Sequence, residues 1–242
     1  METIPVEERF AKAKALFDNG DYLEAIEEFK IVTVQFQGSD YGDDAQFYLA
    51  ECRFTRGEYI LASAEYDNLI RLMPNSPFTT LARYKRAESF YRLSPKSQLD
   101  QKYTRYAVDN FQTYIEYSPT DSMVKDAEAK ITELTTKLAK KMFDGGKLYY
   151  RMEYYKAAIS YFDKLIQDYH DTPFADDGLF WKAKSQKERK DFMGAVQTLN
   201  DLQTKYPETD LKAEISELQQ KIQDDKKEYE DDQRIRKLST IE

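Results

Sequence analysis

Asn19-Gly20-Asp21-Tyr22-Leu23-Glu24-Ala25-Ile26 is a short polar turn that leads directly into the start of an amphipathic helix. The same arrangement returns as Arg56-Gly57-Glu58-Tyr59-Ile60-Leu61-Ala62, and weaker copies occupy residues 152–159 and 190–196. A turn that recurs between helical segments indicates an internal repeat of helix pairs. The rest of the chain can therefore be aligned on this turn.

The alignment gives five units that share a small residue in each of their two helices. In the first helices these residues are Ala13, Ala50, Ala87, Gly146 and Ala183, and in the second helices they are Ala25, Ala62, Ala107, Ala158 and Ala195. We expect the helices of each pair to cross at these points, because a larger side chain would push their axes apart. Chance amphipathic helices would not place a small residue at every crossing. The pattern is typical of the tetratricopeptide unit.

Two further positions repeat in the same register. Four residues after the second-helix alanine comes a large apolar residue, namely Phe29, Tyr66, Phe111, Phe162 and Leu199. The second helices are expected to end near Gln37, Pro74, Pro119, His170 and Pro207, since proline cannot continue a helix. A single helix pair cannot bury its apolar face, so stacked neighbours complete the core. The sequence thus predicts an all-α tetratricopeptide-repeat solenoid of five helix pairs.

The repeat is interrupted in two places. In the third unit, residues 93–101 are inserted between the two helices, and their Ser, Pro and Gln content favours an exposed loop. Residues 124–144 contain no Gly or Pro and carry apolar residues at helical spacing. They predict one long helix between repeats three and four, from about Asp121 to Arg151, which would join the two halves rigidly.

After Pro207, apolar residues at helical spacing predict a C-terminal capping helix over Leu211, Ile215, Leu218 and Ile222. The charged residues beyond it favour a frayed, solvated helix. We therefore expect three parts. Residues 1–120 form an N-terminal half with repeats one to three. Residues 121–222 hold the long helix, repeats four and five and the capping helix, and residues 223–242 form a charged tail.

Composition excludes several classes of protein. The net charge of −8 and the pI of about 5.0 do not favour binding to nucleic acid. Cys52 is the only cysteine, so no intrachain disulfide can form. No apolar run approaches the ~18 residues of a membrane span. The start METIPVEERF has neither the basic nor the apolar region of a secretory signal, so we expect no signal peptide in the chain as it stands.

Residues that often carry catalysis have simpler explanations here. His170 is the only histidine and falls at a helix end, and Cys52 falls inside a helix without a histidine partner. Gly145-Gly146-Lys147 lacks the spacing of a phosphate-binding loop. Acidic pairs such as Asp43-Asp44 and Asp176-Asp177 fall at helix starts, where the helix dipole favours carboxylates. The sequence predicts a protein that is not an enzyme and has no cofactor and no metal site.

Aromatic residues recur at two positions of the first helices, which line the concave face of a tetratricopeptide array. In repeats one to three they are Phe10, Phe17, Phe47, Phe54, Tyr84 and Tyr91. One interpretation is ordinary core packing. The other is a ladder of partly exposed rings that forms a peptide-binding groove.

The corresponding inward positions of repeats four and five are mostly basic. They are Lys140, Lys147, Arg151, Lys184 and Lys187, against Asp177. One interpretation is ordinary solvated lysine. The other is a docking surface for an acidic partner, since the excess stands out on a chain of net charge −8.

Four segments carry a resemblance to a known family: residues 13–29, 69–91, 110–134 and 148–173. In the order of the five units, the insertion in repeat three and the long helix into repeat four, the chain resembles the BamD family. These are the tetratricopeptide lipoproteins of the bacterial outer-membrane β-barrel assembly machine. The resemblance covers about residues 6–207 and leaves out the charged tail.

The resemblance implies a non-enzymatic scaffold at the periplasmic face of the outer membrane. Such a scaffold would link substrate β-barrel polypeptides to the barrel-insertion subunit, with other assembly lipoproteins as further partners. The aromatic groove would take the C-terminal segments of unfolded outer-membrane proteins, and the basic positions would dock the barrel-insertion subunit. Membrane contact would come only through an N-terminal lipid anchor, whose cysteine this chain lacks.

Two alternatives stay open from the sequence. One is a periplasmic envelope-organising repeat protein, a kind that usually has an N-terminal coiled coil, and no heptad run precedes Phe10. The other is a cytosolic helical-repeat regulatory subunit of an enzyme complex. A signal peptide ending in a lipidation cysteine in the native gene would support the first interpretation and exclude the cytosolic one.

Overall fold

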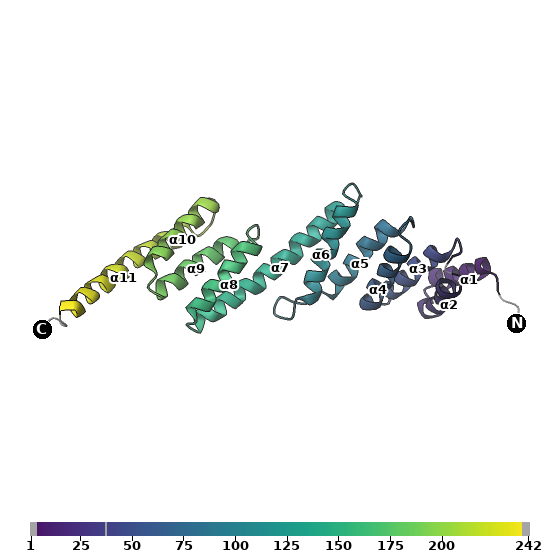
Figure 1. Ribbon diagram of the computed structural model, residues 1–242, viewed down its shortest axis with the longest axis horizontal. Coiled ribbons are helices and arrows are strands. Elements are labelled where there is room, and N and C mark those ends of the chain that lie inside the picture. Colours follow the sequence, from purple (N-terminus) through teal and green to yellow (C-terminus); the bar gives the residue numbers. More distant parts are fainter. Residues whose placement is uncertain (1–3, 37, 239–242) are drawn as a thin grey trace. The chain divides into compact units, whose positions relative to one another are not determined.

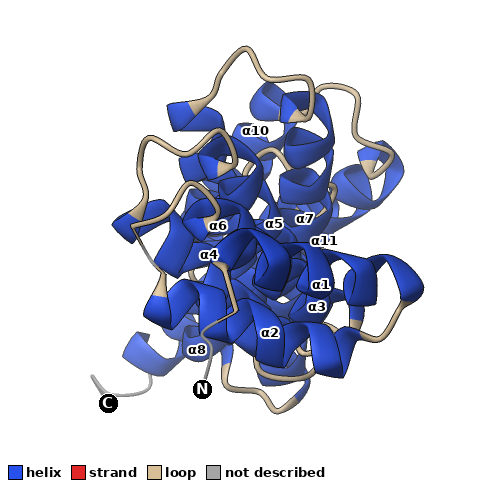
Figure 2. Ribbon diagram, turned by 90° about the vertical axis from the view of Figure 1, so that its right-hand side faces the viewer, coloured by secondary structure: helices blue, strands red, loops and turns tan. Residues whose placement is uncertain are grey.

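The computed structural model describes residues 4–36 and 38–238, which form eleven α-helices and contain no strand (Figures 1 and 2). The helices are α1 (Val6–Asn19), α2 (Tyr22–Gln35), α3 (Gly42–Thr55), α4 (Tyr59–Leu72), α5 (Thr79–Leu93), α6 (Lys102–Tyr117), α7 (Val124–Arg151), α8 (Tyr155–Asp168), α9 (Ala175–Glu188), α10 (Phe192–Lys205) and α11 (Lys212–Leu238). The expected all-α class is confirmed. The second helices of the pairs end shortly before the predicted marker residues, of which Gln37 lies outside the described part.

The repeated turn has one backbone conformation in four of the five units. Gly20 and Gly57 adopt positive φ angles of 87° and 75°, and Glu153 and Lys190 take the same place in repeats four and five with φ angles of 63° and 62°. In each case the next residue donates its N–H back to the helix that has just ended, as Asp21 does to the Leu16 carbonyl at 2.9 Å. Glycine adopts this conformation without steric cost, whereas Glu153 and Lys190 do not.

The small residues lie at the helix crossings, as predicted. The nine alanines of the set are all completely buried, and so are the five large residues that follow the second-helix alanines. The tenth small residue, Gly146, lies against the ring of Phe162, where a Cβ would come within 2.5 Å of Cε1. The register of the five units, read from the sequence, is therefore confirmed.

The described chain divides into two compact units, residues 1–134 and 135–242, of which residues 1–3, 37 and 239–242 are not described. Hydrophobic clusters of the first unit include those around Phe29 and Tyr66, and clusters of the second include those around Phe162 and Leu199. The division falls within α7, whereas the sequence placed a boundary at residue 120. The three-part division stays a prediction.

The helix α7 begins at Val124, slightly later than expected. Asp121 explains the start, because its carboxylate accepts the N–H of Met123 at 2.9 Å and the hydroxyl of Tyr114 at 2.5 Å. These hydrogen bonds hold the pKa of Asp121 below its usual value. Asp121 therefore stabilises the turn before α7 and is not part of the helix.

The loop inserted in the third unit is only partly the exposed excursion that the sequence suggested. Its tip is exposed, but Ser97 and Gln101 are buried. The Gln101 amide nitrogen donates to the carbonyls of Lys96 and Leu99 at 2.8 and 3.0 Å, and its oxygen accepts from the Thr104 hydroxyl at 2.7 Å. The expectation was wrong for Gln101, because loop carbonyls turned toward the protein need a donor.

The C-terminal helix caps the last repeat as predicted, with Ile215, Leu218 and Ile222 buried against α9 and α10. The helix continues to Leu238. Its contact with the preceding repeat extends at least to Tyr229, since Asp225 pairs with Lys187 at 2.6 Å and Tyr229 packs on Phe192. The described part of the tail is therefore not only a solvated extension. No described helix has the length and apolar content needed to cross a membrane.

Candidate protein-binding surfaces

The rings of the first repeat are half-buried and belong to an aromatic cluster. Phe10 lies 5.1 Å from Tyr41, and Phe17 lies 5.2 Å from Tyr48, measured between ring centroids. Lys14 places its ammonium 5.0 Å from the centre of the Tyr48 ring. Both predicted groove residues therefore have part of their surface free and part in the core.

In the second repeat the two predicted rings differ. Phe47 is only 6 % exposed and stacks on Phe78 with centroids 4.5 Å apart, so it offers little surface to a ligand. Phe54 is half-buried and meets the edge of Tyr59. The ammonium of Lys85 lies 4.8 Å from the Phe54 ring and 3.4 Å from the Glu51 carboxylate. An aromatic surface beside mixed charge is thus present at Phe54.

The third-repeat rings are engaged by the first turns of α7. Tyr84 is 7 % exposed and donates its hydroxyl to Asp126, while Tyr91 donates to Glu133 at 2.6 Å. Lys130 donates to Asp126 at 2.8 Å and lies over both tyrosine rings. Burial raises the pKa of Tyr84, and the hydrogen bond to Glu133 raises that of Tyr91. Sequence reasoning missed these α7 residues, although their spacing puts them on one helix face.

In the second unit, the predicted docking cations Lys140 and Lys187 have carboxylate partners within the chain, and Arg151 is exposed. Lys140 pairs with Asp144 at 3.0 Å along α7, and Arg151 is exposed at the end of that helix. Lys187 pairs with Asp225 at 2.6 Å and with Glu188 at 3.5 Å. Burial alone would lower the pKa of Lys187, but these partners raise it overall. Lys187 is thus already neutralised by its own chain.

Lys147 and Lys184 are brought together on the single tryptophan. Their ammonium groups lie 4.7 and 4.3 Å from the centre of the Trp181 ring, and Tyr150 meets the same ring at 5.1 Å. Burial, and then the positive charges of nearby lysines, lower the pKa of Lys184. Sequence reasoning missed Trp181, whose rarity and place one turn before Lys184 were the available signal.

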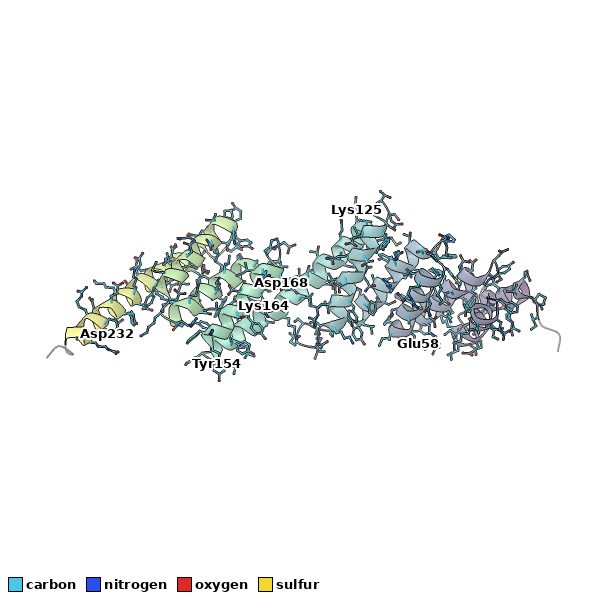
Figure 3. All side chains as sticks on the ribbon, viewed as in Figure 1. Glu58, Lys125, Tyr154, Lys164, Asp168 and Asp232 are labelled. Atoms are coloured by element: carbon cyan, nitrogen blue, oxygen red, sulfur yellow. The ribbon has the colours of Figure 1, made fainter. Side chains whose placement is uncertain are left out.

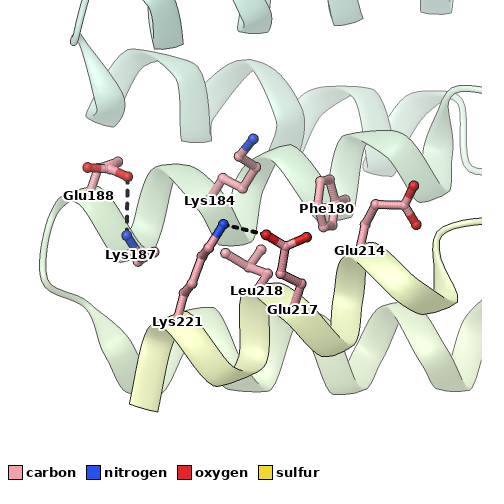
Figure 4. Close-up of a pocket in the computed structure, with 8 residues that line it drawn as sticks. All are labelled: Phe180, Lys184, Lys187, Glu188, Glu214, Glu217, Leu218 and Lys221. Atoms are coloured by element: carbon pink, nitrogen blue, oxygen red, sulfur yellow. Dashed lines mark hydrogen bonds and ion pairs between the residues drawn. The ribbon is translucent and has the colours of Figure 1, made fainter. Parts of the chain in front are cut away.

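A pocket of about 330 Å³ lies beside this cluster, between α9 and α11 (Figure 4). Phe180 and Leu218 supply its apolar part, and Lys184 is one of its lining cations. A second, more open pocket of about 670 Å³ lies at the start of α8 and is lined by Tyr154, Tyr155 and Arg189. Figure 3 shows Tyr154 at the edge of its unit, where the side chain is 59 % exposed.

Cys52 and His170 are the two residues that were considered for catalysis from the sequence. Burial raises the pKa of the Cys52 thiol to about 12, so the thiolate nucleophile is not available near neutral pH. His170 is exposed, and its backbone carbonyl accepts the Tyr206 hydroxyl at 2.7 Å. Among the described residues there is no group of three His, Cys, Asp or Glu that could hold a metal ion.

Comparison with known proteins decides the family. A family model described as "Outer membrane lipoprotein" (YfiO) matches residues 2–190. The chain belongs to the YfiO outer membrane lipoprotein family. A tetratricopeptide-repeat model matches residues 177–209, which include most of α9 and all of α10. The tetratricopeptide fold predicted from the sequence is therefore shown.

The relatives carry the name that the sequence resemblance suggested. A protein of Rickettsia prowazekii named outer membrane protein assembly factor BamD is 27 % identical over 73 % of this chain and 70 % of its own length. A protein of the same name from Haemophilus influenzae is 23 % identical over 84 % of this chain and 80 % of its own length. Among solved structures, the P58(IPK) TPR domain has a TM-score of 0.46 at 14 % identity, covering 93 % of this chain and 66 % of that one. The expected resemblance to BamD is confirmed.

Proposed function

We propose that this chain is a non-enzymatic protein-binding scaffold in outer-membrane protein assembly, at the periplasmic face of the outer membrane. The observation that carries the proposal is the family match over residues 2–190, supported by relatives named outer membrane protein assembly factor BamD. A solenoid of helix pairs suits the role, because its stacked repeats present extended binding surfaces. Its partners are proteins, including the barrel-insertion subunit, other assembly lipoproteins and unfolded outer-membrane proteins.

The first unit is the proposed site for the C-terminal segment of an unfolded outer-membrane protein. Such a segment commonly ends in an aromatic residue, which suits the half-buried rings of Phe17, Phe54 and Tyr91 beside mixed charge. Phe47 and Tyr84 support this site from within the core. Aromatic anchors of this kind contribute most of the binding energy of a peptide in a groove.

The second unit is the proposed docking surface for the barrel-insertion subunit. Lys147 and Lys184 on Trp181, with Arg151 nearby in the sequence, supply positive charge on a chain of net charge −8. Charge of this kind directs orientation and association rate more than affinity. The two surfaces belong to different units, so one chain would hold substrate and insertion subunit at the same time.

Binding titrations at low and high salt test the proposal. The probes are a peptide from the C-terminus of an outer-membrane protein and the soluble part of the barrel-insertion subunit. Exposed charges are screened over about 10 Å at 0.1 M salt, so subunit docking should weaken as salt rises. Peptide binding should change little, because its driving force is removal of apolar area from water. Failure of both probes to bind would contradict the scaffold role.

A further inference from the structure

Two ammonium groups share one indole ring in the second unit. Lys184 lies one turn after Trp181 on α9, and its Nζ is 4.3 Å from the centre of the ring. Lys147 reaches the same ring from α7, with Nζ at 4.7 Å, and its ammonium is also 5.2 Å from the Phe143 ring. An indole face attracts a cation, but two cations at one ring also repel each other. The arrangement therefore holds more positive charge than the ring alone can balance.

Neither lysine forms an ion pair with any residue in the described part of the chain, whereas their neighbours do. On α9, Lys182 pairs with Asp163 at 2.7 Å and Lys187 with Asp225 at 2.6 Å. Figure 4 shows the contrast: Lys221 of α11 turns to Glu217, while Lys184 points from α9 away from α11. These neighbouring lysines have carboxylate partners within the chain, whereas Lys147 and Lys184 are left without an ion pair.

Three acidic residues lie near enough to affect this charge: Glu188 and Glu217 interact with Lys184, and Asp177 interacts with Lys147. Burial and the adjacent Asp176 raise the pKa of Asp177, and Lys147 offsets only part of that rise. Asp177 forms no ion pair with Lys147 in the described structure, so it offsets the lysine only through space. A carboxylate brought in from outside would compete with Asp177 and would be attracted by both ammonium groups.

We propose that Lys147, Trp181 and Lys184 form a binding site for an aspartate or glutamate side chain in an acidic segment of a protein partner. The inference rests on the proposed docking role of this unit and names the ligand chemistry at its centre. Charge complementarity selects the partner: on a chain of net charge −8, an acidic segment is repelled elsewhere and is attracted here. A pair of ammonium groups held at one aromatic ring favours a carboxylate, because hydrogen bonds between charged groups are stronger than those between neutral ones.

The pocket beside the site adds a second preference. It has a volume of about 330 Å³ and an apolar part formed by Phe180 and Leu218. Lys184, Lys187 and Lys221 line it together with Glu188, Glu214 and Glu217, so the pocket itself does not favour a carboxylate. That space suits one large apolar side chain next to the carboxylate in the partner's sequence. The segment that the site takes therefore has a carboxylate for the lysine pair and an apolar residue beside it for the pocket.

Trp181 makes the test local, because it is the only tryptophan in the chain. The probe is the peptide acetyl-Glu-Asp-Phe-Glu-Asp-amide, and its matched control replaces every Glu by Gln and every Asp by Asn. Titration of the full chain with the acidic peptide should change the Trp181 fluorescence to saturation. The amide peptide should bind at least about fivefold more weakly, the effect expected for a partly exposed ion pair.

Variants locate the binding. Lys147→Gln and Lys184→Gln should each weaken the acidic peptide about fivefold, and Lys184→Arg should retain binding because it keeps the charge. Lys164→Gln, an exposed lysine of α8 (Figure 3), is the matched control and should have no effect. Asp177→Asn should strengthen binding, since it removes the competing carboxylate. Thermal melts of all variants verify that each is folded.

Four outcomes would overturn the proposal. Equal binding of the amide peptide would show that carboxylates are not recognised. Unchanged binding to folded Lys147→Gln and Lys184→Gln chains would place the peptide elsewhere. Saturation by acetate or phosphate at the same concentration would indicate an adventitious ion only. Equally tight binding of acetyl-Gln-Asn-Phe with a free C-terminus would assign the site to chain ends instead of acidic side chains. None of these outcomes bears on whether the insertion subunit docks, which the titrations with that subunit measure separately.

Discussion

Gly146 of α7 lies directly against the ring of Phe162 in α8, so closely that a Cβ on the glycine would come within 2.5 Å of Cε1. Phe162 is fully buried, so its ring could move away only by displacing other buried groups. The same close approach explains the buried alanines at the other crossings of helix pairs. Close helix axes are therefore the physical basis of the repeat.

Gly146→Ala should destabilise the protein by about 1–3 kcal/mol, the usual cost of overpacking a core. Alanine is the better helix former, so propensity alone would predict the opposite sign. Chemical denaturation measures the free energy of unfolding. Gly38→Ala is the control, because a Cβ there has no neighbour within 4 Å. A Gly146→Ala chain as stable as the unchanged protein would contradict the crossing geometry.

The αL position of the repeated turn makes a paired prediction. Glu153→Gly and Lys190→Gly should each raise stability by up to about 1 kcal/mol, because they relieve a left-handed conformation in a non-glycine residue. Gly20→Ala and Gly57→Ala introduce the same strain and should each lower stability by about 1 kcal/mol. Thermal melts of the four variants measure these changes in stability, and a change in the same direction for all four would contradict the explanation.

Asp126 should make the first unit sensitive to acid. Hydrogen bonds from Lys130 and Tyr84 hold its pKa below the ordinary 3.8, so its ionised form stabilises the folded state. That contribution is fully present above pH 3.8 and is lost as the pH falls through the lower, folded-state pKa. Asp126→Asn should therefore be less stable than the unchanged protein at about pH 6, with the difference shrinking at about pH 3. Denaturation at both pH values measures the difference in stability, and a difference that grows in acid would contradict this prediction.

Gln101 should matter more than its place in a loop suggests. Gln101→Ala removes the donor for two loop carbonyls and the acceptor for Thr104, with an expected cost of about 1–3 kcal/mol. Lys96→Ala in the same loop should cost little, because the Lys96 side chain is exposed and only its backbone carbonyl takes part. Equal effects of the two changes on the melting temperature would show that the amide does not brace the loop.

The sequence predicted the fold well because the repeat register depends on residue size at fixed spacing. Both can be read within a short stretch of the chain. Ala62, Gly146 and Phe162 all have the environments that their positions in the repeat require. The candidate sites were harder. The contact of Lys130 with Tyr84 and that of Lys147 with Trp181 join residues far apart in sequence, and no local period specifies which side chains meet. Gln101 was missed for the same reason, since polarity in a loop does not reveal an inward hydrogen bond.

The central claim is that one chain holds substrate peptide on its first unit and a folded partner on its second. Two double variants test it most directly: Phe54→Ala with Tyr91→Ala, and Lys147→Glu with Lys184→Glu, each titrated with the outer-membrane-protein peptide and with the barrel-insertion subunit. The account predicts that the aromatic variant loses the peptide and keeps the subunit, while the charge-reversed variant loses the subunit and keeps the peptide. Equal loss of both ligands by both variants, with their helical circular dichroism intact, would contradict it.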